Sequence, residues 1–134
     1  MAAKTLLLIL ALLAPAAALS QSPQAVLECR FTGTDFVYDC VIRLQRAGKA
    51  LERAEITVGA DMPSMPMAHN VKPVKAKPGK APGEYLARLD LEMQGEWAVK
   101  LRLAGPVKDQ LVVLYDFDDK GAKPVTRAGK PPRK

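Results

Sequence analysis

Residues 61–70 read Asp-Met-Pro-Ser-Met-Pro-Met-Ala-His-Asn and hold the most chemically distinctive side chains of the sequence. The soft donors lie within eight positions: Met62, Met65, Met67 and His69, the last being the single histidine of the chain. Thioether sulfur and imidazole nitrogen favour Cu(I) over Mg²⁺, Ca²⁺ or Mn²⁺, which prefer oxygen ligands. The residue types and their spacing therefore predict a Cu(I) site in this segment.

The chemistry of these residues suits an acidic, oxidising compartment. A thioether cannot be protonated and forms no disulfide, so methionines remain available as ligands there, whereas His69 binds only when it is neutral. Pro63 and Pro66 bar a helix and remove two backbone N–H donors, so the segment cannot pair as a continuous strand. Residues two apart in an extended chain are about 6.5–7 Å from one another, so Met65 and Met67 converge on one ion only if the segment curves.

Three further residues are candidates for the same site. Met93 is a candidate additional ligand, Trp97 could flank the ion, and Asp61 could hydrogen-bond His69 from outside the ligand shell. A second interpretation stays open, because methionine also fills irregular gaps in protein cores. In that case Met62 and its neighbours plug the open end of a fold, and Met93 and Trp97 are core residues.

The segments that position this group belong to an exported chain. Lys4, an apolar run over residues 6–13 and small residues at 16–18 are typical of a signal peptide, with cleavage after residue 18 or 20. We assign residues 1–20 to this peptide, which is too short for a comfortable transmembrane span, and we expect no span after its removal. The mature protein is then periplasmic or secreted.

The basic charge is concentrated at the C-terminus. The chain carries 20 Lys and Arg against 14 Asp and Glu, but residues 120–134 hold six basic side chains and no acid. Residues 21–119 hold 13 basic and 14 acidic side chains, so we assign the basic charge to a tail and not to a binding face, and we expect no nucleic acid as a partner. The tail has almost no apolar residues and is predicted to be disordered. It either aids solubility or touches an anionic membrane or an acidic partner.

Cys29 and Cys40 are the two cysteines of the chain, and in an oxidising compartment they most simply pair. The turn signal at residues 33–35 folds the flanking strands into a hairpin that places residue 29 opposite residue 40. Opposed strand residues have Cα atoms about 4.5–5.5 Å apart, a distance that a disulfide accepts. The alternative is a two-thiolate metal site, which requires that the pair stay reduced.

Apolar residues alternate with polar ones in nearly every segment, which is typical of half-buried strands. Turn signals separate seven predicted strands, at residues 25–32, 36–45, 50–59, 70–76, 84–92, 96–104 and 109–117. Pro73 suits an edge strand. The pattern predicts an all-β, immunoglobulin-like antiparallel β-sandwich that forms one domain over residues 21–119.

This strand order brings distant segments together. If every connection reverses the chain direction, the turn at 33–35, the loop at 60–69 and the turn at 93–95 lie at one end of the sandwich. Met93 and Trp97 then approach the methionine segment, although they lie about 25 residues further along the chain.

Two motifs resemble the YtkA-like family, which is akin to the extracytoplasmic domain of FixH proteins. They are Met-Pro-Ser-Met-Pro-Met-Ala-His at residues 62–69, and a Gly-x-Tyr strand followed by a Gly-x-Trp strand over residues 83–97. The resemblance covers about residues 36–117. It implies an immunoglobulin-like β-sandwich with no established enzymatic activity, often found near copper transport or cytochrome oxidase assembly functions. It carries the role of the family's Met-Pro loop onto Met62, Met65, Met67 and His69.

The methionine-rich loop is also similar to that of CopC-type copper-resistance proteins. The chain differs from them because it lacks the N-terminal histidine of their Cu(II) site. It differs from FixH proteins in its cleavable signal and in having no evident transmembrane anchor. These departures weigh against a direct role in oxidase assembly.

Residue patterns for catalysis are missing from the sequence. With one histidine, no Gly-x-Ser-x-Gly, no glycine-rich phosphate loop and no free cysteine expected, no nucleophile–base pair can be named, so we expect no enzyme. The sequence predicts a monomeric, soluble periplasmic protein that carries or buffers Cu(I) for a copper exporter or another copper protein, in trafficking or resistance. The alternative is a non-metal interaction module that docks through its Met-Pro loop on a transporter or on an oxidase-assembly partner.

Overall fold

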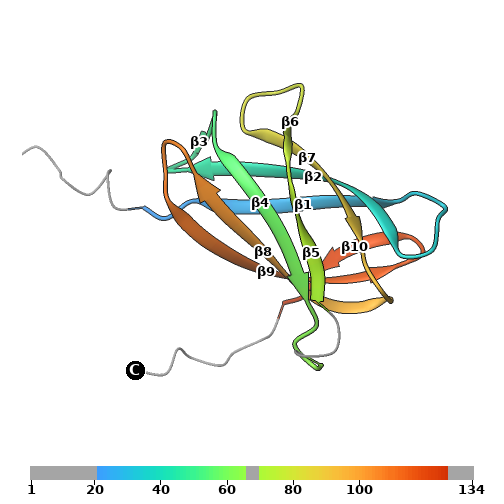
Figure 1. Cartoon of the computed structure of the whole chain (residues 1–134). Helices are drawn as coiled ribbons and strands as arrows, with labels where there is room; N and C mark the ends of the chain where they lie inside the picture. Colours follow the sequence, from blue (N-terminus) through green and yellow to red (C-terminus); the bar gives the residue numbers. More distant parts are fainter. Residues whose placement is uncertain (1–20, 66–69, 127–134) are drawn as a thin grey trace, which may run out of the picture.

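The computed structural model describes residues 21–65 and 70–126 of the chain. Two antiparallel sheets pack face to face, with β4, β8 and β9 running obliquely to β1 and β2 (Figure 1). The strands are β1 (Gln24–Phe31), β2 (Val37–Arg46), β3 (Lys49–Ala50), β4 (Glu55–Asp61), β5 (Asn70–Lys75), β6 (Lys77–Pro78), β7 (Glu84–Asp90), β8 (Gly95–Ala104), β9 (Asp109–Asp118) and β10 (Gly121–Pro124).

Sheet A has the order β1-β2-β7-β6, with β3 beside β2, and sheet B has the order β10-β9-β8-β4-β5. The predicted immunoglobulin-like antiparallel β-sandwich is therefore confirmed. Three short strands, β3, β6 and β10, add to the seven predicted ones. Within the described part of the chain, no helix has the length and apolarity to cross a membrane.

Alternate residues of each strand point into the space between the sheets, as the period-two pattern predicts. The largest fully buried side chains are those of Trp97, Tyr38 and Phe117. Tyr38 donates its hydroxyl to the carbonyl of Asp118 over 2.8 Å and so joins β2 to the end of β9. Burial, followed by the nearby carboxylates of Asp118 and Asp119, raises the pKa of Tyr38, so the hydroxyl keeps the proton that this bond needs.

β1 and β10 join the two sheets on one side of the sandwich. The N–H of Leu27 on β1 donates to the hydroxyl of Tyr115 on β9 over 2.9 Å. Gly121 opens β10 with a φ of +126°, and a Cβ at this position would lie 2.6 Å from the carbonyl oxygen of Cys29. Glycine is needed here both for this close approach and for the positive φ.

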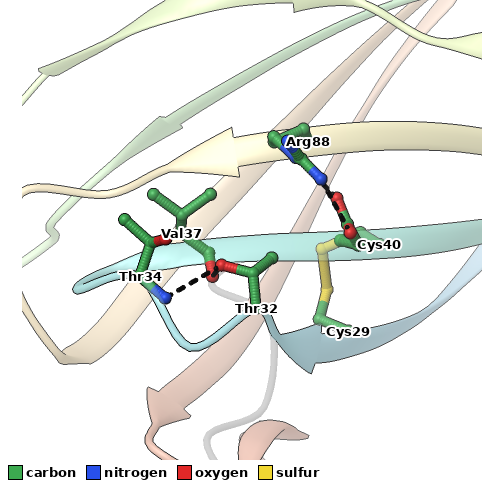
Figure 2. A network of polar contacts seen from close by, with 7 residues as sticks. Cys29, Thr32, Thr34, Val37, Cys40 and Arg88 are labelled. Carbon is green, nitrogen blue, oxygen red and sulfur yellow. Dashed lines mark hydrogen bonds and ion pairs between the residues drawn. A yellow bond between two sulfur atoms is a disulfide. The ribbon is translucent and has the colours of Figure 1, made fainter.

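The β1–β2 hairpin contains the predicted disulfide (Figure 2). Cys29 and Cys40 are directly opposed in the strand register, with Cα atoms 4.0 Å apart and their sulfurs bonded. Thr32 holds the turn between the strands, since its hydroxyl donates to the carbonyl of Val37 (2.9 Å) and accepts from the N–H of Thr34 (3.3 Å). The pairing of the cysteines is confirmed, and neither thiol is free for a two-thiolate metal site.

One predicted strand is divided because the chain changes sheets within it. The segment predicted at 50–59 contributes to β3 in sheet A and to β4 in sheet B, and Arg53 adopts a φ of +57° between them. Tyr85 fixes this crossing, because its hydroxyl donates to the carbonyl of Leu51 (2.7 Å) and accepts from the N–H of Ala54 (3.0 Å).

β5 is an edge strand of sheet B, as Pro73 predicts. Its register against β4 shifts between Val58 and Ala60. From β5 the chain passes to β6 at the edge of sheet A, so that β5 and β7 lie near each other on the side opposite β1 and β10.

The prediction of a disordered tail from residue 120 is wrong for its first part. β10 pairs with residues 115–118 of β9, and Ala122 packs against the core, so the domain extends past its predicted end at residue 119. The sequence pattern does not reveal this strand because backbone pairing and one small apolar side chain hold it, without a run of apolar residues. The rest of the predicted tail, residues 127–134, and the predicted signal peptide lie outside the described residues.

Candidate metal centre

The methionine segment leaves the sandwich at the end of β4. Ile56, Val58 and Ala60 of this strand point into the core, and Met62 continues the same phase with 4% of its surface exposed. Met62 therefore belongs to the core cluster, which is the position that the core-filling interpretation predicts for it. If Met62 binds the ion, its sulfur does so from the buried side of the site.

The chain reverses direction immediately after Met62. The N–H of Met65 donates to the carbonyl of Met62 over 3.0 Å, so Pro63 and Ser64 occupy the middle of a β-turn. The Cα atoms at the ends of such a turn are less than about 7 Å apart. Met65 is 38% exposed. The curvature that convergence requires is thus present between the first two methionines of the segment.

Met93 reaches the same end through the connection between β7 and β8. It is half-buried against the core, and its carbonyl accepts from Nε1–H of the fully buried Trp97 over 3.0 Å. Gly95 lies between them, and a Cβ at Gly95 would lie 3.3 Å from the methyl carbon of Met62. Met62 therefore lies directly over this connection, and the predicted meeting of the two segments is confirmed.

Asp61 has an ion-pair partner that sequence reasoning missed. Its carboxylate, with 19% of the side chain exposed, pairs with Nζ of Lys100 on β8. The sequence feature that could have indicated this ion pair is the alternation in β8, where Lys100 points outward between the inward residues Val99 and Leu101. The expected hydrogen bond from Asp61 to His69 stays a prediction, because His69 lies outside the described residues.

Met67 also lies outside the described residues, so its ligand role stays a prediction together with that of His69. Over residues 21–65 and 70–126, no three His, Cys, Asp or Glu side chains are grouped in a way that could hold a metal ion. The donors that the described residues bring to this end are thioethers, from Met62, Met65 and Met93.

This donor set fits Cu(I) by its chemistry. Thioethers are soft ligands that select Cu(I), and two of them belong to a single turn while the third comes from the adjacent connection. Met65 is exposed, whereas Met62 is buried in the core and Met93 packs half-buried against it. Trp97 is placed as a core aromatic whose indole N–H fixes the backbone at Met93.

A family model described as YtkA-like matches residues 33–102. The matched region begins in the β1–β2 turn and ends within β8, so it includes the methionine segment, Met93 and Trp97. Neither a curated protein nor a solved structure matches the chain.

Proposed function

Because the chain belongs to the YtkA-like family, whose domains are of extracytoplasmic type, we propose that it is a periplasmic Cu(I)-binding protein. It carries or buffers copper, in trafficking or in resistance, for an exporter or another copper protein. We further propose that it works as a monomer without enzymatic activity. The segment proposed to hold the ion is the loop that leaves β4.

The observation that carries this proposal is the turn between Met62 and Met65. It places an exposed thioether within one turn of a buried one, beside the connection that contains Met93. In the proposed site Met65, Met67 and His69 are the outer ligands, and Met62 and Met93 contribute from the core side. Bound Cu(I) would supply no catalysis here, since the ion is the cargo.

The exposure of Met65 supports a role in transfer. A ligand at the surface can be exchanged for a donor of a partner protein without unfolding of the sandwich, whereas a fully enclosed ion could not leave in this way. His69 would add one proton-sensitive ligand, so we expect binding to weaken as the pH falls below about 6.5, the ordinary pKa of histidine.

Competition with a chromogenic Cu(I) chelator, under anaerobic conditions with ascorbate, tests the proposal on the chain from residue 21 onward. We expect stoichiometric binding that weakens by about tenfold or more in the double variant Met65→Leu/Met67→Leu, a loss of about 1.4 kcal/mol or more. Leucine keeps the apolar volume and removes the sulfur. His69→Ala should weaken binding less, and Val112→Ala, on the exposed outer face of β9, should not change it. Parent-like binding by the double variant would place the site elsewhere.

The burial of Met62 favours a second candidate function. A methionine that is 4% exposed and part of the core needs no metal to explain it. In this case the protein is an interaction module that docks through the Met-Pro loop on a transporter or on a FixH-like oxidase-assembly partner. Failure of the parent chain to bind Cu(I) in the chelator competition would leave this second function.

A further inference from the structure

The outer face of sheet A carries a groove that is not lined by any methionine of the described segments. Its volume is about 960 Å³, and it crosses β1, β2 and β7 to the β5–β6 segment, with Lys120 at the β1 side. The groove therefore extends across the whole sheet. Neighbouring strands lie about 4.8 Å apart, so the three spacings from β1 to β6 span about 14 Å. This width matches four to five residues of an extended chain, at about 3.3 Å per residue.

The strand register arranges the groove in rows of outward side chains. The rows across β1, β2 and β7 are Arg30–Asp39–Arg88 and Glu28–Val41–Leu86. Lys77 on β6 lies opposite Leu86 and extends the second row. Charged residues thus surround a small apolar floor, in which Leu86 is 43% exposed.

The groove has a strong excess of positive charge. The described residues that line it include two carboxylates, Glu28 and Asp39, and six cationic side chains, Arg30, Arg43, Lys75, Lys77, Arg88 and Lys120. Five of these cations belong to residues 21–119, and Lys120 belongs to the predicted tail. The body is near neutral as a whole, but the strand register collects its cations on one face.

Both carboxylates of the groove are already paired. Arg88 donates two hydrogen bonds to Asp39 (2.8 and 3.0 Å), and Arg43 donates one to Glu28 (2.6 Å). The hydrogen bond from Arg88 lowers the pKa of the Asp39 carboxyl, so this group stays ionised at neutral pH. Figure 2 shows Arg88 reaching toward β2 above the disulfide.

Four cations remain to meet an anionic ligand. Arg30, Lys75, Lys77 and Lys120 form no ion pair with any residue of the described segments. Lysine and arginine bind carboxylates through charge-assisted hydrogen bonds, which are stronger than neutral ones. The apolar floor would suit aliphatic side chains that alternate with those carboxylates.

We propose that this groove binds an extended acidic segment of a partner polypeptide. Carboxylates of the segment contact the free cations, and its apolar side chains contact Val41 and Leu86. Nucleic acid suits the groove less well, because none of the described residues that line it is aromatic and could stack on a base. A flat bilayer suits it less well, because a planar surface cannot reach the floor of a groove.

Fluorescence anisotropy tests this proposal with a labelled eight-residue peptide of alternating Glu and Val, and the chain from residue 21 onward. We expect saturable binding that weakens with added salt, and no binding of the matching Lys-Val peptide. The double variant Lys77→Glu/Lys120→Glu should weaken binding about tenfold or more. Neither lysine has an ion-pair partner in the described residues, so the change breaks no ion pair there.

The matched control reverses the same number of charges elsewhere. Arg102→Glu/Lys108→Glu changes two exposed cations at β8 and the loop after it, outside the groove, and should leave peptide binding within about twofold of the parent. Equal losses in the two double variants would overturn the proposal, because they would show an effect of net charge alone. Tighter groove-dependent binding of phosphatidylglycerol vesicles or of a single-stranded oligonucleotide would also overturn it. The copper-site variant Met65→Leu/Met67→Leu should not alter peptide binding. Failure of the peptide proposal can therefore be distinguished from failure of the copper proposal.

Discussion

Variants of Met62 distinguish a packing role from a ligand role better than variants of any other methionine in the described segments. Its side chain is 4% exposed, belongs to the core and lies over Gly95. Truncation of a buried methionine to alanine costs about 2–5 kcal/mol, because it removes buried apolar surface and leaves a cavity. For a domain of about 100 residues each kcal/mol lowers Tm by about 4–8 °C, so a loss near 3 kcal/mol in Met62→Ala corresponds to a decrease of about 12–24 °C.

Met62→Leu isolates the sulfur. Leucine has nearly the volume of methionine, so this variant should lose less than about 1.5 kcal/mol. Stability is measured by urea denaturation and by thermal unfolding with the disulfide intact, and Cu(I) affinity is measured on the same samples. A ligand role predicts that Met62→Leu binds Cu(I) more weakly while it stays folded. If Met62→Ala were as stable as the parent, the assignment of Met62 to the core would be refuted.

Three further predictions concern the β-sandwich itself. Gly121→Ala should destabilise the domain by about 1–3 kcal/mol in urea denaturation, because the position has φ +126° and a Cβ would lie 2.6 Å from the carbonyl of Cys29. Reduction of the Cys29–Cys40 bond should cost about 2–4 kcal/mol in the same assay. Arg88→Met should raise the pKa of Asp39, followed by NMR titration, because Arg88 holds it below its ordinary value of 3.8. In the parent this contribution to stability is complete above pH 3.8 and is lost as the pH falls through the lower folded-state pKa.

Matched variants control these predictions. Gly59→Ala adds a Cβ whose nearest contact, Cγ of Pro73, is 3.9 Å away, so it should stay close to the parent. Equal losses at Gly59 and Gly121 would contradict the close-approach argument. Arg102→Met should leave the Asp39 titration unchanged, and an unchanged titration in Arg88→Met would contradict the assigned cause. Parent-like stability of the reduced protein would show that the disulfide does not constrain the unfolded chain.

The period-two pattern predicts the core well because burial on one face is a local property of each strand. On β2 the residues Tyr38, Cys40, Ile42 and Leu44 share a phase in the sequence, and all four are buried. The disulfide follows from the same logic, since a short turn between two strands fixes the register that opposes its cysteines. Predictions of this kind need information from only two neighbouring segments.

Features that depend on several strands could not be predicted in this way. The crossing from β3 to β4 rests on hydrogen bonds from Tyr85, which lies more than 30 residues further along the chain. β10 rests on backbone pairing to β9, and the cationic groove on the register of β1, β2 and β7. At the candidate metal centre, the sequence predicted that the methionine segment and the β7–β8 connection meet at one end of the sandwich. It did not predict the β-turn between Met62 and Met65 or the ion pair between Lys100 and Asp61.

Both β5 and β7 run from the groove toward the methionine end of the sandwich, and this makes the independence of the two proposed sites testable. β5 begins directly after the methionine segment, and its last residues, Val74 and Lys75, border the groove. Because β5 is paired to β4 at both of its ends, ligand binding at one site should move it little at the other. We therefore expect Cu(I) to change the affinity for the Glu-Val peptide by less than about threefold, and thermodynamic linkage requires the same factor in reverse. A larger reciprocal factor would show that β5 or β7 transmits a shift between the two sites, because both strands adjoin the groove and the methionine end.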